Sequence, residues 1–149
     1  MGKKSQIPKP SQKKQQSRIP EQATQLNRPS STDDEHPSFR FTYADKNRWL
    51  LSDWTSSEIN DLIEGLKKIE KYTCGQIKGH GSKKRGESVG TGYKLINIHP
   101  TLPDNIPEDE RLSEMRIDEK KRIFGFRVHS VYYIIWFDRD HSVCPEYSL

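Results

Sequence analysis

The chain has 149 residues, a net charge of +4 and a hydrophobic fraction of only 31%, which suits one domain with an appendage. Its longest unbroken apolar run, Val131 to Phe137, is far too short for a transmembrane helix, and its N-terminus lacks the apolar stretch of a secretory signal. We therefore expect a soluble, cytoplasmic protein that contacts no membrane. Cys74 and Cys144, which have no CxxC spacing, are expected to be free thiols.

The first 36 residues differ in composition from the rest. Lys, Gln, Ser and Pro dominate them, and their few large apolar side chains are Met1, Ile7, Ile19 and Leu26. Such a segment cannot bury enough surface to offset its chain entropy, so we expect a disordered basic tail at 1–36 and a single α+β domain at 37–149. Residues 1–31 carry a net charge of +6, whereas residues 32–149 carry −2. The tail is either an electrostatic handle for a polyanion such as nucleic acid or a solvated leader without a partner.

Two elements open the domain. Phe39, Phe41 and Tyr43 alternate with polar residues, which predicts a half-buried strand. Thr55 and Glu58 have the spacing of a capping box, and apolar residues then recur on one helical face: Ile59, Leu62, Ile63, Leu66 and Ile69. The pattern predicts a long helix over 56–71, and a short second helix is expected over 73–78.

The second half of the domain supplies further strands. A glycine-rich stretch has loop composition, after which 93–98 is expected to be a strand and 108–115 a short helix with Leu112 and Met115 facing inward. Two dense apolar runs follow, 122–128 and 131–137, separated by two residues. They predict an antiparallel hairpin whose second strand is central and covered on both faces.

This order of elements resembles the small α+β fold of the RelE/ParE toxin superfamily. The run RIFGFR, followed by VYYIIWFDRDHSVCP, is also similar to a group of uncharacterised bacterial proteins that read roughly RIWG and then WDPxHxVxP, with an R-L pair upstream as at Arg111 and Leu112. The resemblance implies a small antiparallel sheet packed on one face by one long helix and one or two short ones. It also implies toxin action on RNA or the ribosome, or on DNA gyrase, and a cognate antitoxin. The domain departs from that family in being nearly neutral.

Metal-independent RNA cleavage needs a base, a proton donor and cations for the developing phosphorane charge. Arg127, His141 and Arg122 are the catalytic candidates for an endoribonuclease of this kind. The alternative is that residues 138–141 form a polar turn that ends a strand, with Asp138 capping local amides and the arginines ion-paired or solvated. A zinc site is disfavoured because no second pair of ligands is present, and we expect neither a metal nor a cofactor.

Basic residues near the glycine-rich loop, joined by one at the end of the hairpin, are candidates for contact with RNA: Lys78, His80, Lys83, Lys84, Arg85 and Arg139. The alternative is a loop that is merely solvated. Its glycine spacing imitates a phosphate loop, but Glu87 stands where the essential lysine belongs, so we expect no nucleotide cofactor. Two hypotheses remain, a toxin-like protein that acts on RNA or translation, and a non-catalytic nucleic-acid- or protein-binding domain with a basic arm.

Overall fold

The computed structural model describes residues 31–81, 90–97 and 100–144. One compact unit begins at Thr32, and the expected disordered tail lies outside the described residues except for 31–36. Residues 33 and 35 are bonded to the domain, because the Gly75 N–H donates to the Asp33 carbonyl and the Cys74 N–H to the Glu35 carbonyl, each at 2.8 Å. In the part of the chain that is described, no helix has the length and apolarity that a membrane crossing requires.

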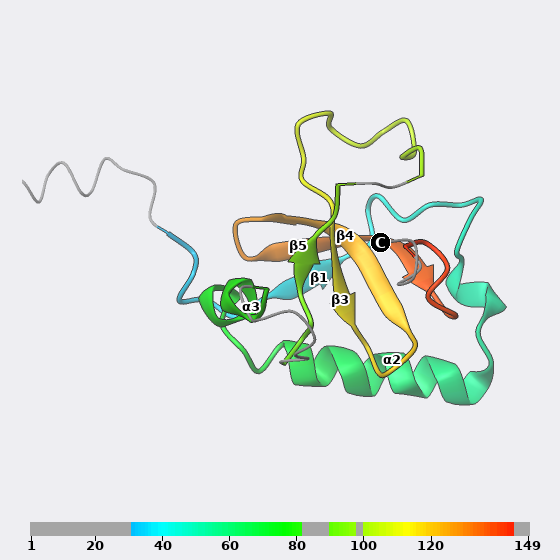
Figure 1. Ribbon diagram of the computed structural model, residues 1–149, viewed down its shortest axis with the longest axis horizontal. Helices are drawn as coiled ribbons and strands as arrows, with labels where there is room; N and C mark the ends of the chain where they lie inside the picture. Colours follow the sequence, from blue (N-terminus) through cyan, green and yellow to red (C-terminus); the bar gives the residue numbers. More distant parts are fainter. Residues whose placement is uncertain (1–30, 82–89, 98–99, 145–149) are drawn as a thin grey trace, which may run out of the picture. The chain divides into compact units, whose positions relative to one another are not determined.

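Five strands form one mixed sheet in the order β1-β5-β4-β3-β2 (Figure 1). Their bounds are Ser38–Arg40 for β1, Lys94–Leu95 for β2, Ser113–Arg116 for β3, Arg122–Val128 for β4 and Val131–Asp138 for β5. β1 runs parallel to β5, and the other neighbours are antiparallel. The α+β class is confirmed, whereas the expectation of a purely antiparallel sheet is wrong. Helices and three strands separate β1 from β5, a connection long enough to bring the chain back in the same direction.

The helices begin where the sequence indicates. A 3-10 turn, η2, precedes the long helix α2 and the short helix α3, and their bounds are Leu51–Asp53, Ser56–Ile69 and Cys74–His80. At the start of α2 the Thr55 hydroxyl accepts from the Glu58 N–H, and the Glu58 carboxylate accepts from the Thr55 N–H. Thr73 and Gln76 make the same exchange at the start of α3. These capping boxes fix both helix starts.

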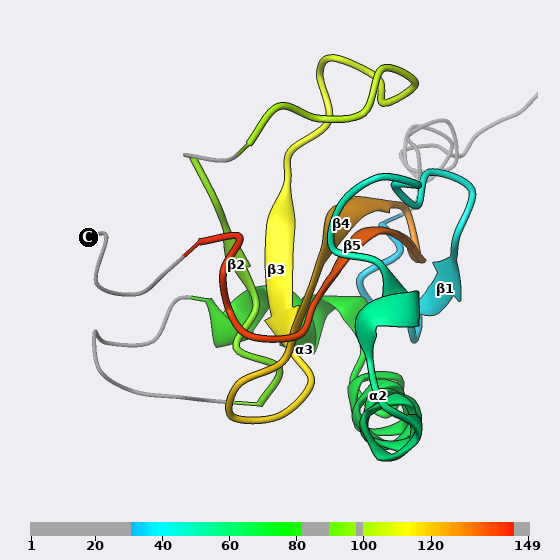
Figure 2. The same ribbon diagram turned by 90° about the vertical axis from the view of Figure 1, so that its right-hand side faces the viewer.

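Both α-helices cover one face of the sheet, here called the helix face (Figures 1 and 2). Leu62, Ile69 and Ile77 pack there on strand and turn residues: Met115, Ile117, Ile123, Tyr132, Ile134 and Phe137. The opposite side, the loop face, carries a second buried cluster: Ile106, Leu112, Phe124, Phe126, Ile135, Trp136 and Val143. Since β5 contributes to both clusters, the prediction of a central strand covered on both faces is confirmed. The buried stripe of α2 is narrower than predicted, because Ile59 and Ile63 are 37% and 49% exposed.

The expected hairpin of β4 and β5 is confirmed, but it contains a β-bulge. Phe124 pairs with Trp136 and Gly125 with Ile134, so Ile135 has no partner opposite it. One extra residue changes the alternation of side chains along a strand. As a result Ile135 and Trp136, although consecutive, both belong to the cluster on the loop face.

The predicted helix at 108–115 is wrong, because this segment leads into strand β3. Leu112 and Met115 have helical spacing, yet they belong to the clusters on opposite faces of the sheet. Pairing with β4 supplies the hydrogen bonds of this segment and overrides its weak helical pattern. The strands expected at 39–43 and 93–98 are present but shorter than predicted.

The capping box of α2 gives a direct test of this helix start. Replacing Thr55 by alanine removes the acceptor of the Glu58 N–H, and we expect the free energy of unfolding to fall by about 1 kcal/mol. Urea denaturation followed by circular dichroism measures this change. Ser56→Ala, one position later in the exposed first turn, is the matched control, and an equal loss in both variants would contradict a specific role for the cap.

Candidate functional site

Charged residues meet on the loop face where β4 begins and β5 ends. The register places Lys94 of β2 beside Glu114 of β3, which in turn lies beside Phe124 of β4. Two residues before Phe124 on the same strand, Arg122 lies beside Asp138 of β5. Because side chains alternate between the two faces of a strand, residues 122 and 124 share the face of residue 114. The strands thus gather two carboxylates and two cations in neighbouring rows.

Glu114 is the unusual member of this group. Its side chain is buried, with the residue only 4% exposed, and its Oε1 has no hydrogen-bond partner among the described residues. Its Oε2 lies 3.8 Å from the Nε of Arg122. Burial raises the pKa of Glu114, although the positive charges of Lys94, Arg122 and His141 oppose that shift. An unpaired buried carboxyl costs free energy, which in native proteins often marks a functional group.

Asp138, by contrast, is fully satisfied and shapes the turn that follows β5. It is completely buried, and its two carboxylate oxygens accept the N–H groups of Ser142 and Val143 at 2.9 Å each. The prediction that Asp138 caps local amides is confirmed. The turn holds His141 at a φ of 61°, a conformation that few residues other than glycine adopt. His141 is thereby placed close enough to Glu114 for its charge to lower the pKa of that carboxyl.

The three catalytic candidates do not lie together. The positive charges of Arg122 and His141 both lower the pKa of Glu114. Arg127 lies instead on the helix face, beside Cys74 and Ile77. Its guanidinium donates to Asp33 Oδ1 at 2.8 Å, and it also bonds Thr32 Oγ1 and a backbone carbonyl. Arg127 thus anchors the segment that precedes β1.

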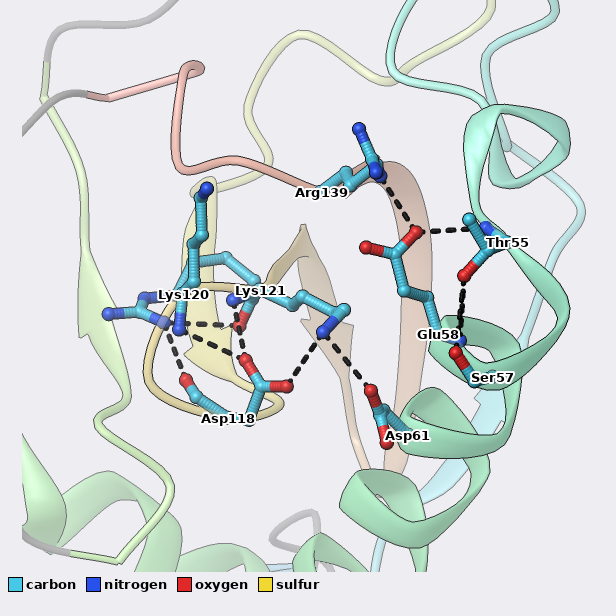
Figure 3. A network of polar contacts seen from close by, with 9 residues as sticks. Thr55, Ser57, Glu58, Asp61, Asp118, Lys120, Lys121 and Arg139 are labelled. Atoms are coloured by element: carbon cyan, nitrogen blue, oxygen red, sulfur yellow. Dashed lines mark hydrogen bonds and ion pairs between the residues drawn. The ribbon is translucent and has the colours of Figure 1, made fainter.

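Arg139, a candidate for RNA contact, is tied to the start of α2 (Figure 3). Its Nε donates to the Glu58 Oε1 at 2.7 Å, and this bond is the largest cause that lowers the pKa of Glu58 to about 2. Nearby, the Lys121 ammonium lies between Asp118 and Asp61, at 2.9 and 3.1 Å. These contacts join the end of β5 and the turn between β3 and β4 to the long helix.

The remaining RNA-contact candidates are dispersed. The Lys78 ammonium pairs with Asp33 at 3.0 Å. His80 accepts from or donates to the Thr91 hydroxyl at 3.0 Å and meets the ring of Tyr72 edge-on. Both side chains therefore have partners within the domain. The other three candidates, Lys83, Lys84 and Arg85, lie outside the described residues.

The site residue that sequence reasoning missed is Glu114. It belongs to the predicted helix at 108–115, in which a glutamate is expected to face solvent. The signal that could have found it is the sequence SEMR at 113–116. If this segment is a strand, its side chains alternate, so Glu114 lies on the face opposite Met115. Among the described residues, no group of three or more His, Cys, Asp or Glu side chains could hold a metal ion.

Comparison of the chain with family models, with curated proteins and with solved structures gave no match. The class that can be stated from the fold and the site is therefore an α+β domain with a mixed five-stranded sheet, two helices on one face and a buried carboxyl among cations on the other.

Proposed function

We propose that this chain is a toxin-like domain of the RelE/ParE type that cleaves RNA without a metal ion. The observation that carries the proposal is Glu114, a buried carboxyl with an unpartnered oxygen and a raised pKa, beside Arg122 and His141. A base works best when its pKa lies near the working pH. The raised pKa moves Glu114 in that direction.

The arrangement of elements supports the RelE/ParE type. A strand, a long helix, a short helix and then further strands follow one another along the chain, and the helices cover one face of the sheet. The candidate site lies on the opposite face, which neither α2 nor α3 covers. Fold likeness does not by itself grant activity, so the chemistry has to rest on the site.

The chemistry assigns one role to each of three residues. Glu114 takes the proton of the ribose 2′-hydroxyl, and the 2′-oxygen attacks phosphorus while the bond to the 5′-oxygen breaks. His141 protonates the leaving 5′-oxygen, and Arg122 stabilises the phosphorane charge. The products are a 2′,3′-cyclic phosphate and a 5′-hydroxyl.

The burial of Glu114 limits the access of a substrate to its carboxyl. Its Oε1 is shielded from solvent, and the nearby Cys144 thiol has a pKa that burial and the Glu114 charge raise. A 2′-hydroxyl therefore reaches this carboxyl only when the residues that cover it move aside.

Induction of the full chain in a bacterial host tests the proposal. We expect growth arrest and cleaved messenger RNA, and the purified protein should cut RNA in the presence of EDTA but spare RNA with 2′-deoxy substitution at the cut site. His141→Asn, which tolerates the positive φ, should lower the cleavage rate by roughly 10²- to 10⁴-fold. Arg127→Ala is the control, since it should lower the melting temperature by a few degrees and still cut RNA. Normal growth and intact transcripts with folded protein present would overturn the proposal.

The second candidate is a non-catalytic domain that binds nucleic acid or protein through its basic arm. The charge distribution favours it, because residues 1–31 carry +6 while the rest of the chain is slightly acidic. Deletion of residues 1–30 should then abolish salt-dependent RNA binding and leave the fold intact. The deletion has to stop there, because Thr32 and Asp33 bond Arg127. Unchanged binding in the truncated chain would exclude the arm as the binding element.

A further inference from the structure

We propose that a hollow beside the candidate site binds a nucleobase of the RNA, with guanine preferred. The hollow has a volume of about 440 Å³ and lies at the C-terminal end of β5, lined among others by Arg48, Trp49, Asp53, Arg139 and Asp140. The inference deepens the proposed function and rests on it for the choice of RNA as the ligand.

The hollow adjoins the candidate site through one residue. Ser142, which lines the hollow, accepts the indole N–H of Trp49 at 2.9 Å through its hydroxyl. The same serine donates its N–H to Asp138, the register partner of Arg122. A nucleotide whose phosphate lies near Arg122 can therefore place an adjacent base in the hollow.

The backbone at the hollow is strained. Trp49 has a φ of 50°, an outlier for a bulky residue. Three contacts hold it: its carbonyl accepts the Phe137 N–H at 2.9 Å, its indole N–H bonds Ser142, and its ring meets Trp136 at 5.0 Å between centroids. Strain that is held by several contacts clusters at ligand sites. The contacts fix the indole at the rim of the hollow.

The lining favours an aromatic ligand with both donors and acceptors. Arg48 stacks near Trp49 and Trp136, with its guanidinium carbon 5.2 and 5.4 Å from the ring centroids, and bases stack on indole and guanidinium planes alike. Arg139 uses its Nε for Glu58, and its two terminal nitrogens donate to no other described residue. Planar groups and N–H donors are thus both present.

Two carboxylates decide the class of ligand. Asp53 and Asp140 also line the hollow, and carboxylates repel a bare phosphate but accept N–H groups. Guanine offers O6 and N7 to an arginine, and its N1–H and 2-amino group can donate to a carboxylate. Uracil has one N–H donor and lacks this pairing. The combination of arginine and aspartate therefore fits guanine better than the other bases.

Titration of the full chain with the four nucleoside monophosphates tests the inference. The indole N–H resonance of Trp49 should shift on addition of GMP, and the backbone N–H resonance of Ile77 in α3, which does not line the hollow, should not. GMP should bind about fivefold or more tightly than UMP, and inorganic phosphate should not compete. Equal binding of the four nucleotides, or full competition by phosphate, would overturn the inference.

Variants make the test independent of folding and of cleavage. Trp49→Gly, which relaxes the positive φ while removing the ring, should weaken GMP binding about tenfold, and Arg48→Ala should also weaken it. Trp49→Phe should retain most of the affinity, and Lys46→Ala, an exposed neighbour that does not line the hollow, should change nothing. If the chain binds GMP but never cuts RNA, the hollow is a guanine site and the proposed cleavage is wrong. If the chain cuts RNA but GMP does not shift the Trp49 resonance, the cleavage is supported and the guanine site is wrong.

Discussion

Replacement of Gly125 by alanine is expected to lower the free energy of unfolding by about 3 kcal/mol or more. A Cβ at this position would lie 1.9 Å from the carbonyl oxygen of Tyr133 and 3.1 Å from the Cα of Ile134. Both are backbone atoms of the paired strand, so the clash cannot be relieved by a side-chain rotation. The two central strands would have to separate where the sheet is buried on both faces.

The loss should extend to the site as well as to stability. Gly125 sits at the bulge, which directs Trp136 onto the loop face. There the Trp136 indole N–H donates to Asp45 at 2.8 Å, and its ring contacts Trp49. Any shift of β5 that accommodates a methyl group at residue 125 therefore also displaces the wall of the hollow.

Gly79→Ala is the matched control for this substitution. Gly79 lies within α3, and a Cβ there would meet no atom of the described residues within 4 Å. Alanine favours the helix, so this variant should gain about 0.5–1 kcal/mol. Chemical denaturation of both variants measures the contrast in sign. A Gly125→Ala protein as stable as the unmodified chain would show that the strands do not approach so closely.

Local signals were sufficient for the elements that depend on short-range physics. The capping box at Thr55 and Glu58 located the start of α2, and the two apolar runs located the hairpin, because capping and burial act within a few residues. The segment at 108–115 failed because Leu112 and Met115 have helical spacing by coincidence, while pairing with β4 decided its conformation. The parallel pairing of β1 with β5 is also long-range, and no local sequence pattern predicts it.

The candidate site was predictable only in part, for a related reason. Arg122 and His141 were identified from their residue types at the ends of the hairpin strands. Their relation to Glu114 depends on the register of β3, which no local pattern specifies. Arg127 lies on the other face of β4, because side chains alternate along a strand, and it pairs there with Asp33.

Replacement of Glu114 by glutamine is expected to raise stability at neutral pH and to abolish cleavage. Glutamine keeps the shape of the side chain and removes a charge that burial disfavours, so we expect the free energy of unfolding to rise. Arg122 keeps its bonds to the backbone carbonyls of Asp118 and Lys121, at 2.8 and 3.1 Å. RNA cleavage should fall by roughly 10²- to 10⁴-fold because the base is lost. Opposite signs for stability and activity separate a functional carboxyl from a structural one.

The pH dependence of stability supplies the second half of this test. The pKa of Glu114 is raised in the folded chain above its usual value of 4.5, so the folded state holds this proton more tightly than the unfolded state. The destabilisation is absent below pH 4.5, grows as the pH rises to the folded-state pKa, and is constant above it. Thermal melts across this range should therefore show the advantage of Glu114→Gln growing with pH.

Glu58→Gln is the control with the opposite sign. The pKa of Glu58 is lowered to about 2, chiefly by its hydrogen bond to Arg139, so its stabilisation is complete above pH 4.5 and is lost as the pH falls toward 2. Glu58→Gln should therefore be less stable than the unmodified chain at neutral pH, with the difference vanishing in acid. If Glu114→Gln behaved in the same way, Glu114 would be a structural partner of Arg122, and the assignment of Glu114 as the base would fall with it.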